Sequence, residues 1–214
     1  MIKIERIVCN MLQENCYIVG DETGECVIVD CGAWYEGERK AIVDCIRKNG
    51  WTPRHLLCTH GHVDHNFGID TIYETYGLQP EVHAGDTSFM EDLCGQALEF
   101  TGYRPDNTYP AIGRFISDSD DIKFGSHTLH VIHTPGHSRG SVCFHIADEN
   151  ILLTGDTLFR RSIGRTDLPG GSMMQIIQSL RLLAQLPDET QVLPGHGPCS
   201  TMGEELRTNP FLDR

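Results

Sequence analysis

The sequence predicts an α/β fold in which two β-sheets pack face to face with helices on their outer sides. Short segments rich in β-branched residues alternate with longer helical segments, a pattern typical of strands connected to helices. The order of strands followed by helices also occurs twice along the 214 residues, with no linker or low-complexity tract between the halves. We therefore expect a two-sheet sandwich that forms one domain over residues 1–214.

The first half is expected to begin with three strands and to continue with alternating helices and strands. Strands are predicted at residues 2–8, 15–20, 25–30, 55–60 and 81–85, and helices at residues 37–50, 68–77 and 87–100. Gly50 is placed to end the first helix, because glycine readily adopts the left-handed conformation found at helix C-termini.

The second half repeats this order. Strands are predicted at residues 127–135, 141–148, 150–156 and 190–197, and a helix at residues 172–186. The pattern predicts these elements but not the order of the strands within each sheet.

The charge balance argues against a nucleic-acid partner. Lys and Arg number 17 against 30 Asp and Glu, which makes the formal net charge −13. Such a chain is repelled by a phosphate backbone unless a local basic patch intervenes. A small-molecule substrate is the more natural expectation.

The cysteines and the first residues favour a cytoplasmic protein. The nine cysteines form no CxxC pair, are odd in number, and several lie in apolar segments, as expected of buried, reduced thiols. The first ten residues lack the apolar core of a signal peptide, and no apolar run is long enough to cross a bilayer. We therefore expect no membrane association.

The segment THGHVDHNFG, residues 59–68, concentrates side chains that bind metals. It follows a predicted buried strand and precedes a predicted helix. A turn can converge His60 and His62 on one ion, while Asp64 and His65 face a neighbouring ion. This loop supplies about half of a metal site.

Three later segments have the same setting, an apolar strand that ends in a polar residue. They supply His137 in PGHS, Asp156 in TGDTLF and His196 in PGHG, each beside a glycine that lets the backbone turn closely. Polar residues gathered at strand ends are how α/β proteins usually build their sites. The alternative, a set of turn residues and helix caps, leaves five histidines at strand ends without a packing purpose.

The four motifs HGHVDH, PGHS, TGDTLF and PGHG, in this order, resemble the metallo-β-lactamase superfamily. The matches run from Thr59 to Gly197, and the preceding strand pattern agrees, so the resemblance covers essentially the whole chain. It implies an αββα four-layer sandwich with a metal site along one edge.

The resemblance also implies a ligand set for two divalent metal ions. His60, His62 and His137 match the ligands of the first metal, Asp64, His65 and His196 match those of the second, and Asp156 bridges both. Zinc suits these imidazoles and carboxylates best, and iron and manganese tolerate the same ligands. Two such cations hold a bridging hydroxide near neutral pH and polarise an acyl carbonyl, so no serine or cysteine nucleophile is needed.

Two carboxylates are expected to take part in catalysis. Asp64 is placed to orient the hydroxide by a hydrogen bond, and Asp156 acts as an electrostatic bridge rather than as a general base.

The segment GDTLFRRSIGRTDLPGGS, residues 155–172, is similar to glyoxalase II-type (hydroxyacylglutathione hydrolase-like) thioester hydrolases. In that group a basic residue of this turn contacts the glutathione part of the substrate, and Arg165 is the matching position. The ending GHGPCSTMGEELRTNPFL resembles the compact single-domain members, without the helical domain that supplies much of the glutathione contact. A salt bridge between Arg165 and Asp167 is the competing interpretation of this turn.

A thioester hydrolase is the leading hypothesis, and two others compete with it. The sequence also resembles persulfide dioxygenases, which share the fold but use a single iron, held by residues matching His60, His137 and Asp156. A regulatory metal-binding module is less consistent with a complete ligand set, because structural sites usually close with four ligands. Nucleases and true β-lactamases rank lower, and the acyl group, the thiol carrier and the oligomeric state stay open.

Overall fold

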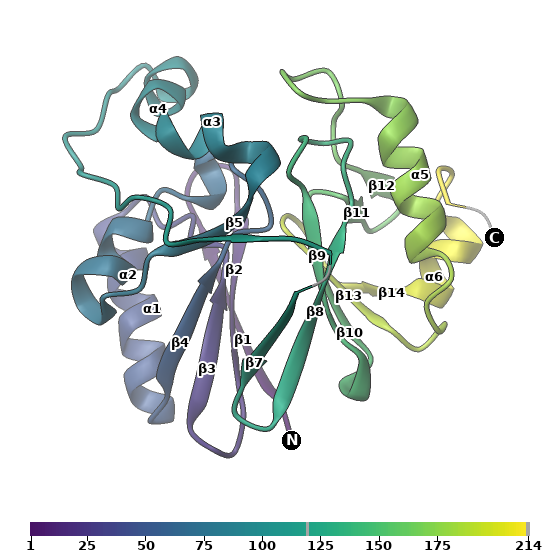
Figure 1. Ribbon diagram of the computed structural model, residues 1–214, viewed down its shortest axis with the longest axis horizontal. Helices are drawn as coiled ribbons and strands as arrows, with labels where there is room; N and C mark the ends of the chain where they lie inside the picture. Colours follow the sequence, from purple (N-terminus) through teal and green to yellow (C-terminus); the bar gives the residue numbers. More distant parts are fainter. Residues whose placement is uncertain (119, 213–214) are drawn as a thin grey trace.

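The computed structural model describes residues 1–118 and 120–212. Two six-stranded sheets lie face to face, with helices on the outer side of each (Figure 1). The predicted αββα sandwich is confirmed. No helix in the described ranges is long and apolar enough to span a membrane.

The first sheet takes its strands in chain order. They are β1 (Lys3–Cys9), β2 (Glu14–Gly20), β3 (Glu25–Val29), β4 (Thr52–Leu57), β5 (Pro80–His83) and β6 (Arg114–Ile116). The first three are antiparallel and the pairs from β3 to β6 are parallel. Parallel neighbours need crossover connections, and helices provide most of them here.

The second sheet has the order β14-β13-β10-β9-β8-β7. Its strands are β7 (Asp121–Phe124), β8 (His127–His133), β9 (Val142–Ile146), β10 (Ile151–Gly155), β13 (Gln191–Pro194) and β14 (Ser200–Thr201). A separate small hairpin joins β11 (Leu158–Phe159) to β12 (Ser162–Ile163). Because β8 and β10 are both antiparallel to β9 and β13 is parallel to β10, the chain leaves β8, β10 and β13 at the same edge.

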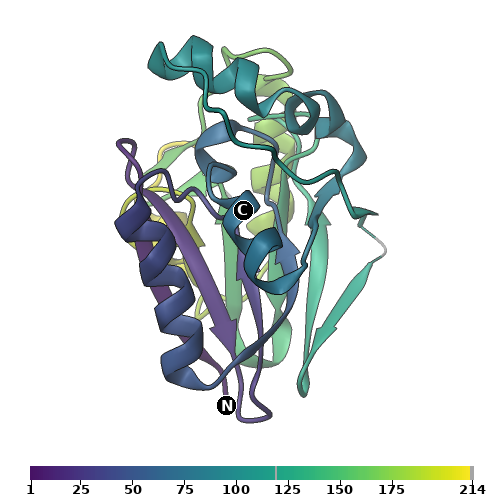
Figure 2. The same cartoon turned by 90° about the vertical axis from the view of Figure 1, so that its left-hand side faces the viewer.

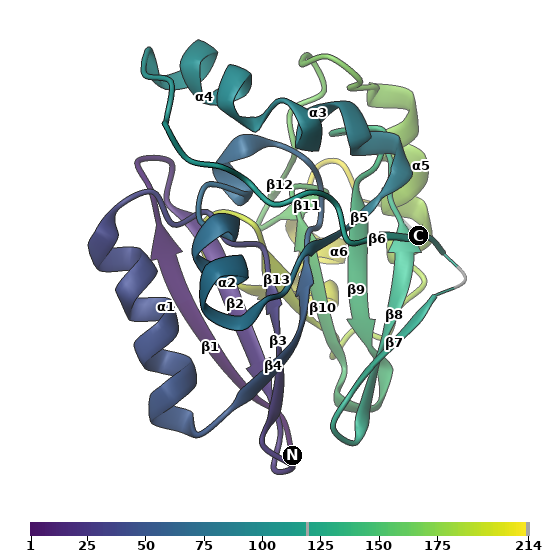
Figure 3. The same cartoon turned by 60° about the vertical axis from the view of Figure 1, so that its left-hand side comes forward.

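Six α-helices are assigned in the described residues. They are α1 (Glu36–Asn49), α2 (Ile69–Tyr76), α3 (Thr87–Glu91), α4 (Leu93–Thr101), α5 (Met173–Leu183) and α6 (Met202–Thr208). Figures 2 and 3 show α1 and α2 against the outer face of the first sheet, with α3 and α4 across its upper end. In Figure 1, α5 and α6 cover the second sheet.

The alternation of side chains along the strands builds three apolar layers. Tyr17 and Val19 of β2 lie in the core between the sheets, whereas Cys16 and Ile18 pack in the core beneath α1 and α2. The third layer joins β9, β10 and β13 to α5 and α6. A strand buried on both faces reads as a continuous apolar run, which is why these segments were recognisable in the sequence.

Some predicted elements differ from the structure. The helix predicted over residues 87–100 is two helices, because Asp92 leaves the helical conformation and its side chain caps α4 by accepting from the Gly95 amide. Strands β6, β7 and β14, the small hairpin and α6 were not predicted. Gly50 does end α1, with φ of 68°.

The nine cysteines are free thiols, as predicted. Most are buried or half-buried, but Cys199 is exposed and so does not serve the packing role expected of it.

We predict that Phe144→Ala, in the core between the sheets, lowers the free energy of unfolding by roughly 3–5 kcal/mol. Phe144 is 0% exposed, so the substitution leaves a cavity that both sheets surround. Leu182→Ala on α5 is the control, since this side chain is 53% exposed and its loss should cost within about 0.5 kcal/mol. Urea denaturation measures both, and equal losses would contradict this description of the core.

Candidate metal centre

The loop after β4 is folded back on itself by a buried amide side chain. Asn66 donates from Nδ2 to the carbonyl oxygens of His60 (3.1 Å) and His62 (2.7 Å). The same loop contacts the second sheet, because the amide of Val142 donates to the carbonyl of Thr59 at 2.8 Å. The sequence forms a tight loop here because one side chain bonds both carbonyls, and the His62 carbonyl also accepts from the His65 amide at 3.2 Å.

The remaining predicted ligands come from the strand ends of the second sheet. His137 follows β8, Asp156 follows β10 and His196 follows β13. The glycine at 195 is required by close approach, since a Cβ there would lie 2.4 Å from Oδ1 of Asp156. Its carbonyl also accepts from the Asn15 amide of β2 at 2.7 Å, which ties the two sheets together at this edge.

The structure brings all seven predicted metal ligands together. Their donor atoms form three groups, each within 4.8 Å: His60, His62 and His137; Asp64, His65 and His196; and His60, His65 and Asp156. The third group connects the other two, which is the position of a bridging carboxylate. Their assignment as ligands is a prediction that this juxtaposition supports.

Individual donor atoms face one another at short distances. Nδ1 of His62 lies 2.9 Å from Nε2 of His137, and the Nε2 atoms of His65 and His196 are 3.2 Å apart. Oδ1 of Asp156 lies 3.3 Å from Nε2 of His65, and its Oδ2 lies 3.6 Å from Nε2 of His137. Donors that share one ion at about 2.1 Å lie at comparable separations.

Two of these donor atoms are buried and have no hydrogen-bond partner in the described part of the chain. They are Nε2 of His60 and Oδ1 of Asp156, and their residues are 1% and 11% exposed. A buried polar atom without a hydrogen bond is costly, and native proteins rarely retain one without reason. A cation among these donors would satisfy both atoms, so the residues fit a metal centre.

Each of four imidazoles has its other ring nitrogen held by an outer partner. Nδ1 of His65 pairs with Asp30 at 2.9 Å, and Nδ1 of His60 lies 3.1 Å from Oγ1 of Thr59. The carbonyls of Arg165 and Leu12 accept from the Nδ1 atoms of His137 and His196, at 2.8 and 3.0 Å respectively. Such contacts direct the Nε2 lone pair of each ring inward, as in metal sites generally.

The protonation states of the cluster suit metal binding. Burial, followed by the positive charge of neighbouring rings, lowers the pKa of His60 far below its usual value and that of His62 to about 4. Burial alone would raise the pKa of Asp156, but His65 and other ring cations lower it overall. His60 and His62 therefore offer neutral imidazoles and Asp156 an ionised carboxylate, the forms that bind metals. The pKa values of His65 and His196 are raised instead, because the carboxylates of Asp156 and Asp64 outweigh the effect of burial.

Asp86 was not identified from the sequence, yet it joins the two loops of the first group. It is 0% exposed and accepts from the Gly61 amide at 2.9 Å, the Ser138 hydroxyl at 2.6 Å and the Gly140 amide at 2.7 Å. Gly61 separates His60 from His62, and Ser138 follows His137 directly. This carboxylate therefore sets how far apart these loops lie.

Asp30 was also missed. Its Oδ1 accepts from the Thr59 amide at 2.7 Å and its Oδ2 pairs with His65, while its backbone holds a φ of +55°. A non-glycine residue rarely adopts that conformation, so the surrounding structure must impose it. Asp30 directly follows an apolar strand, as several of the predicted ligands do. The same sequence pattern could therefore have identified it.

The side chain of Arg165 lies on the surface and pairs with a carboxylate of its own turn. Its Nε and Nη2 atoms donate to Asp167 at 2.8 and 2.6 Å. What reaches the metal cluster is the Arg165 carbonyl, through His137. Substrate binding by the guanidinium stays a prediction.

Two aromatic side chains flank the cluster. The Phe89 ring lies 4.9 Å from the His62 ring on one side, and the Phe159 ring lies 6.2 Å from the His196 ring on the other. An aromatic ring therefore lies close to one histidine of each of the first two groups.

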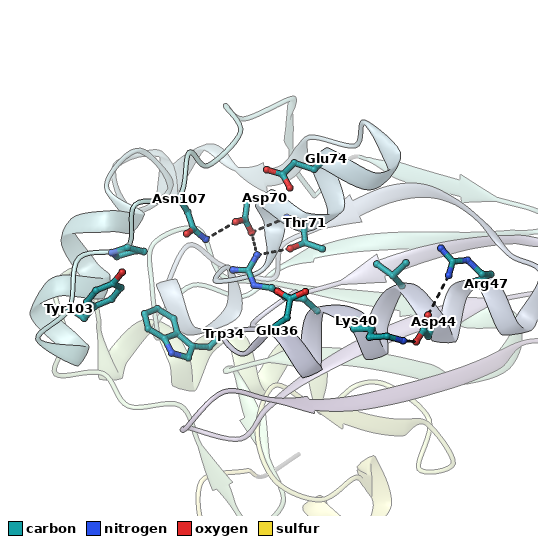
Figure 4. A pocket seen from close by; sticks show the side chains of 13 residues that line it. Trp34, Glu36, Lys40, Asp44, Arg47, Asp70, Thr71, Glu74, Tyr103 and Asn107 are labelled. Carbon is teal, nitrogen blue, oxygen red and sulfur yellow. Dashed lines mark hydrogen bonds and ion pairs between the residues drawn. The ribbon is translucent and has the colours of Figure 1, made fainter.

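A cavity of about 600 Å³ lies elsewhere, between α1, α2 and the loop after α4 (Figure 4). Arg39 donates there to Asp70 at 2.6 Å and to the carbonyl of Phe67, and Asn107 donates to Asp70 at 2.6 Å. Its inner polar groups thus satisfy one another. We interpret it as a junction between elements rather than a site.

The sequence model of the metallo-beta-lactamase superfamily matches residues 9–196, and the chain belongs to this superfamily. An uncharacterized protein of Mycobacterium leprae is 43% identical over 95% of each chain. The probable metallo-hydrolase YqgX of Bacillus subtilis is 33% identical, over 99% of this chain and 98% of the relative. The hydroxyacylglutathione hydrolase GloC of Haemophilus influenzae is 31% identical over 99% of both chains.

Solved structures share the whole fold. The B3 metallo-β-lactamase BLEG-1 is 34% identical over 99% of both chains, with a TM-score of 0.89. TTHA1623 in a di-iron-bound form is 36% identical over 97% of this chain and 100% of its own, with a TM-score of 0.85. ETHE1 from Myxococcus xanthus is 25% identical over 97% of this chain and 83% of its own, with a TM-score of 0.77. The chain is therefore an enzyme of a metallo-hydrolase superfamily whose members bind divalent metals.

We predict that Asp86→Asn weakens metal binding by about 10- to 100-fold without unfolding the protein. An amide has one acceptor oxygen, so either the Gly140 amide or the Gly61 and Ser138 pair loses its acceptor, and one loop is released. Chelator competition on the metal-loaded protein measures this affinity. Asp92→Asn is the matched control, because asparagine also caps helices, and equal losses in both variants would contradict a specific role for Asp86.

Proposed function

We propose that this chain is a cytoplasmic hydrolase that uses two metal ions to cleave thioesters of the hydroxyacylglutathione type. The observation that carries the proposal is the set of seven donors in two linked groups, in which buried atoms of His60 and Asp156 have no hydrogen-bond partner among the described residues. A purely structural site would close around one ion with four ligands. Seven donors around a shared carboxylate suit two ions, with zinc the best match to the ligand types.

Bound there, two cations would supply an activated water and Lewis acidity toward an acyl carbonyl. The chain's own residues would hold and orient the reactants. Asp64 is 15% exposed, with Oδ2 3.3 Å from Nε2 of His196, so its carboxylate lies within the second group and is partly open to solvent. Phe89 and Phe159 would border the acyl part of the substrate on either side.

The choice of substrate rests on two supports. The segment 155–172 resembles glyoxalase II-type enzymes, and the relative GloC of Haemophilus influenzae is named a hydroxyacylglutathione hydrolase. Both point to a thioester whose thiol carrier is glutathione or a similar peptide.

A second candidate is an iron-dependent persulfide dioxygenase. His60, His137 and Asp156 form the two-histidine, one-carboxylate set that such chemistry uses, and Nε2 of His137 lies 3.6 Å from Asp156. The similarity to ETHE1 is consistent with it. The similarity to BLEG-1 adds a β-lactam to the compounds that need testing.

The decisive experiment combines metal analysis of protein purified without added metal with a panel of four substrates. We expect at least two metal ions per chain and cleavage of S-lactoylglutathione, with little activity on a simple alkyl thioester, a cephalosporin or, by oxygen uptake, glutathione persulfide. Asp156→Asn should lower kcat by orders of magnitude, because two cations would lose the negative charge between them. One iron per chain with persulfide-dependent oxygen uptake would instead establish the dioxygenase.

Recognition of the thiol carrier is tested by Arg165→Ala. If the guanidinium bonds a carboxylate or carbonyl of the carrier in place of Asp167, the substitution should raise KM for S-lactoylglutathione roughly tenfold, with kcat little changed. A simple thioester should be indifferent. Arg160→Ala is the control, since Arg160 pairs with Glu204 at 2.9 Å. Equal losses on both substrates would show that Arg165 supports the loop of His137 instead.

A further inference from the structure

A second group of metal-binding side chains lies at the opposite end of the sandwich. It is formed by the turn after β2, the first residue of β8, and the short 3₁₀ helix η3 (Ala147–Glu149). Figures 1 and 3 show these segments together at the lower end, near the N-terminus. His127 begins β8 and His133 ends it, and six residues of extended strand span about 20 Å. This group is therefore separate from the metal centre.

The central residue of this group is His127, which is 8% exposed. Its Nδ1 lies 3.0 Å from Oδ2 of Asp148, the distance of a hydrogen bond. Its Nε2 is buried and has no hydrogen-bond partner among the described residues. A proton on Nδ1, donated to Asp148, leaves a lone pair on Nε2, which is how an outer carboxylate prepares a histidine to bind a metal.

Three further carboxylates lie near this imidazole. Donor atoms of Asp21, Glu22 and His127 lie within 4.8 Å of one another, and Oε1 of Glu149 lies 3.8 Å from Nε2. Asp21 is held firmly, because its Oδ1 accepts from Thr23.

The other oxygen of Asp21 is held as well, since Oδ2 accepts from the amide and the hydroxyl of Ser126. The amino group of Met1 forms an ion pair with Glu22, which a metal ion bound to this carboxylate would displace.

We propose that His127, Asp21, Glu22 and Glu149 bind one divalent transition-metal ion of the zinc or manganese type. One imidazole and three carboxylates make a set of four ligands, the number with which structural zinc sites usually close. Asp21 and Glu22 belong to the first sheet's β2–β3 turn, whereas His127 belongs to β8 of the second sheet and Glu149 to η3, which connects β9 to β10 of that sheet. The ion therefore links the two sheets at the end remote from the metal centre and stabilises the sandwich.

The test measures zinc stoichiometry and thermal stability of the full chain. Chelator-treated protein is reloaded with zinc and analysed by equilibrium dialysis with elemental analysis. Wild-type protein should bind one more zinc ion than His127→Gln. With zinc at about a hundred times its dissociation constant for this site, the Tm of wild type should exceed that of protein with only the metal centre filled by roughly 5 to 10 °C. His127→Gln should lack this gain and keep its turnover.

His130→Gln is the matched control. His130 lies on the same strand and pairs with Asp121 at 2.6 Å, but it is exposed, so its loss should change neither the stoichiometry nor the Tm gain. If His127→Gln does not fold, the double variant Glu22→Gln with Glu149→Gln removes two ligands and leaves the imidazole in place. It should also bind one zinc ion fewer. Equal zinc content in wild type and these variants would overturn the proposal.

Discussion

The loss of water around a compact group of polar side chains is the constraint on which the rest of this structure depends. Burial deprives His60, His65 and Asp156 of hydration. Two of their atoms, Nε2 of His60 and Oδ1 of Asp156, have no hydrogen-bond partner within the described residues in place of water. Leaving such groups dry costs free energy that the packed sandwich must offset. The same cost makes the site selective for its ligand, because only a ligand that forms several strong contacts at once can offset this free energy.

The interactions that close the sandwich also place these donors. The bonds from Asn15 to Gly195 and from Val142 to Thr59 join one sheet to the other at the edge where the strands end. Asp86 then connects the loop of His60 to the loop of His137. Donor distances near 3 Å are therefore a property of the whole fold, since each loop is positioned by the opposite sheet or by a third segment.

This arrangement explains what could be read from the sequence. Buried strands are local patterns, and a polar residue at the end of one is visible without knowledge of the fold, so the seven donors and the two-sheet architecture were predictable. The contact of Asp86 with Ser138 joins residues 52 positions apart, and nothing local marks it. Edge strands such as β6, with 3 residues, are too short to show a periodic pattern, and the break at Asp92 depends on one side chain that prefers to cap a helix. These features depend on tertiary contacts or on sequence patterns of only one to three residues, so the sequence alone did not predict them.

Pairs of carboxylate and imidazole recur across the molecule, and their surroundings decide what each pair can do. His55 pairs with Glu81, but its second nitrogen lies 3.2 Å from the carbonyl of Lys123, so the ring is already satisfied. His130 pairs with Asp121 in water, where a free nitrogen carries little cost.

His65 and His127 differ from these because both are buried and their second nitrogens face further donors. For His65 these are Asp64, Asp156 and His196, and for His127 the facing carboxylate is Glu149. We therefore expect a buried imidazole held by a carboxylate on one side to bind a metal only when its other nitrogen faces further donor atoms and no backbone hydrogen-bonding group lies between. This requirement distinguishes His65 and His127, which lie at opposite ends of the sandwich, from the similar carboxylate–imidazole pairs of His55 and His130.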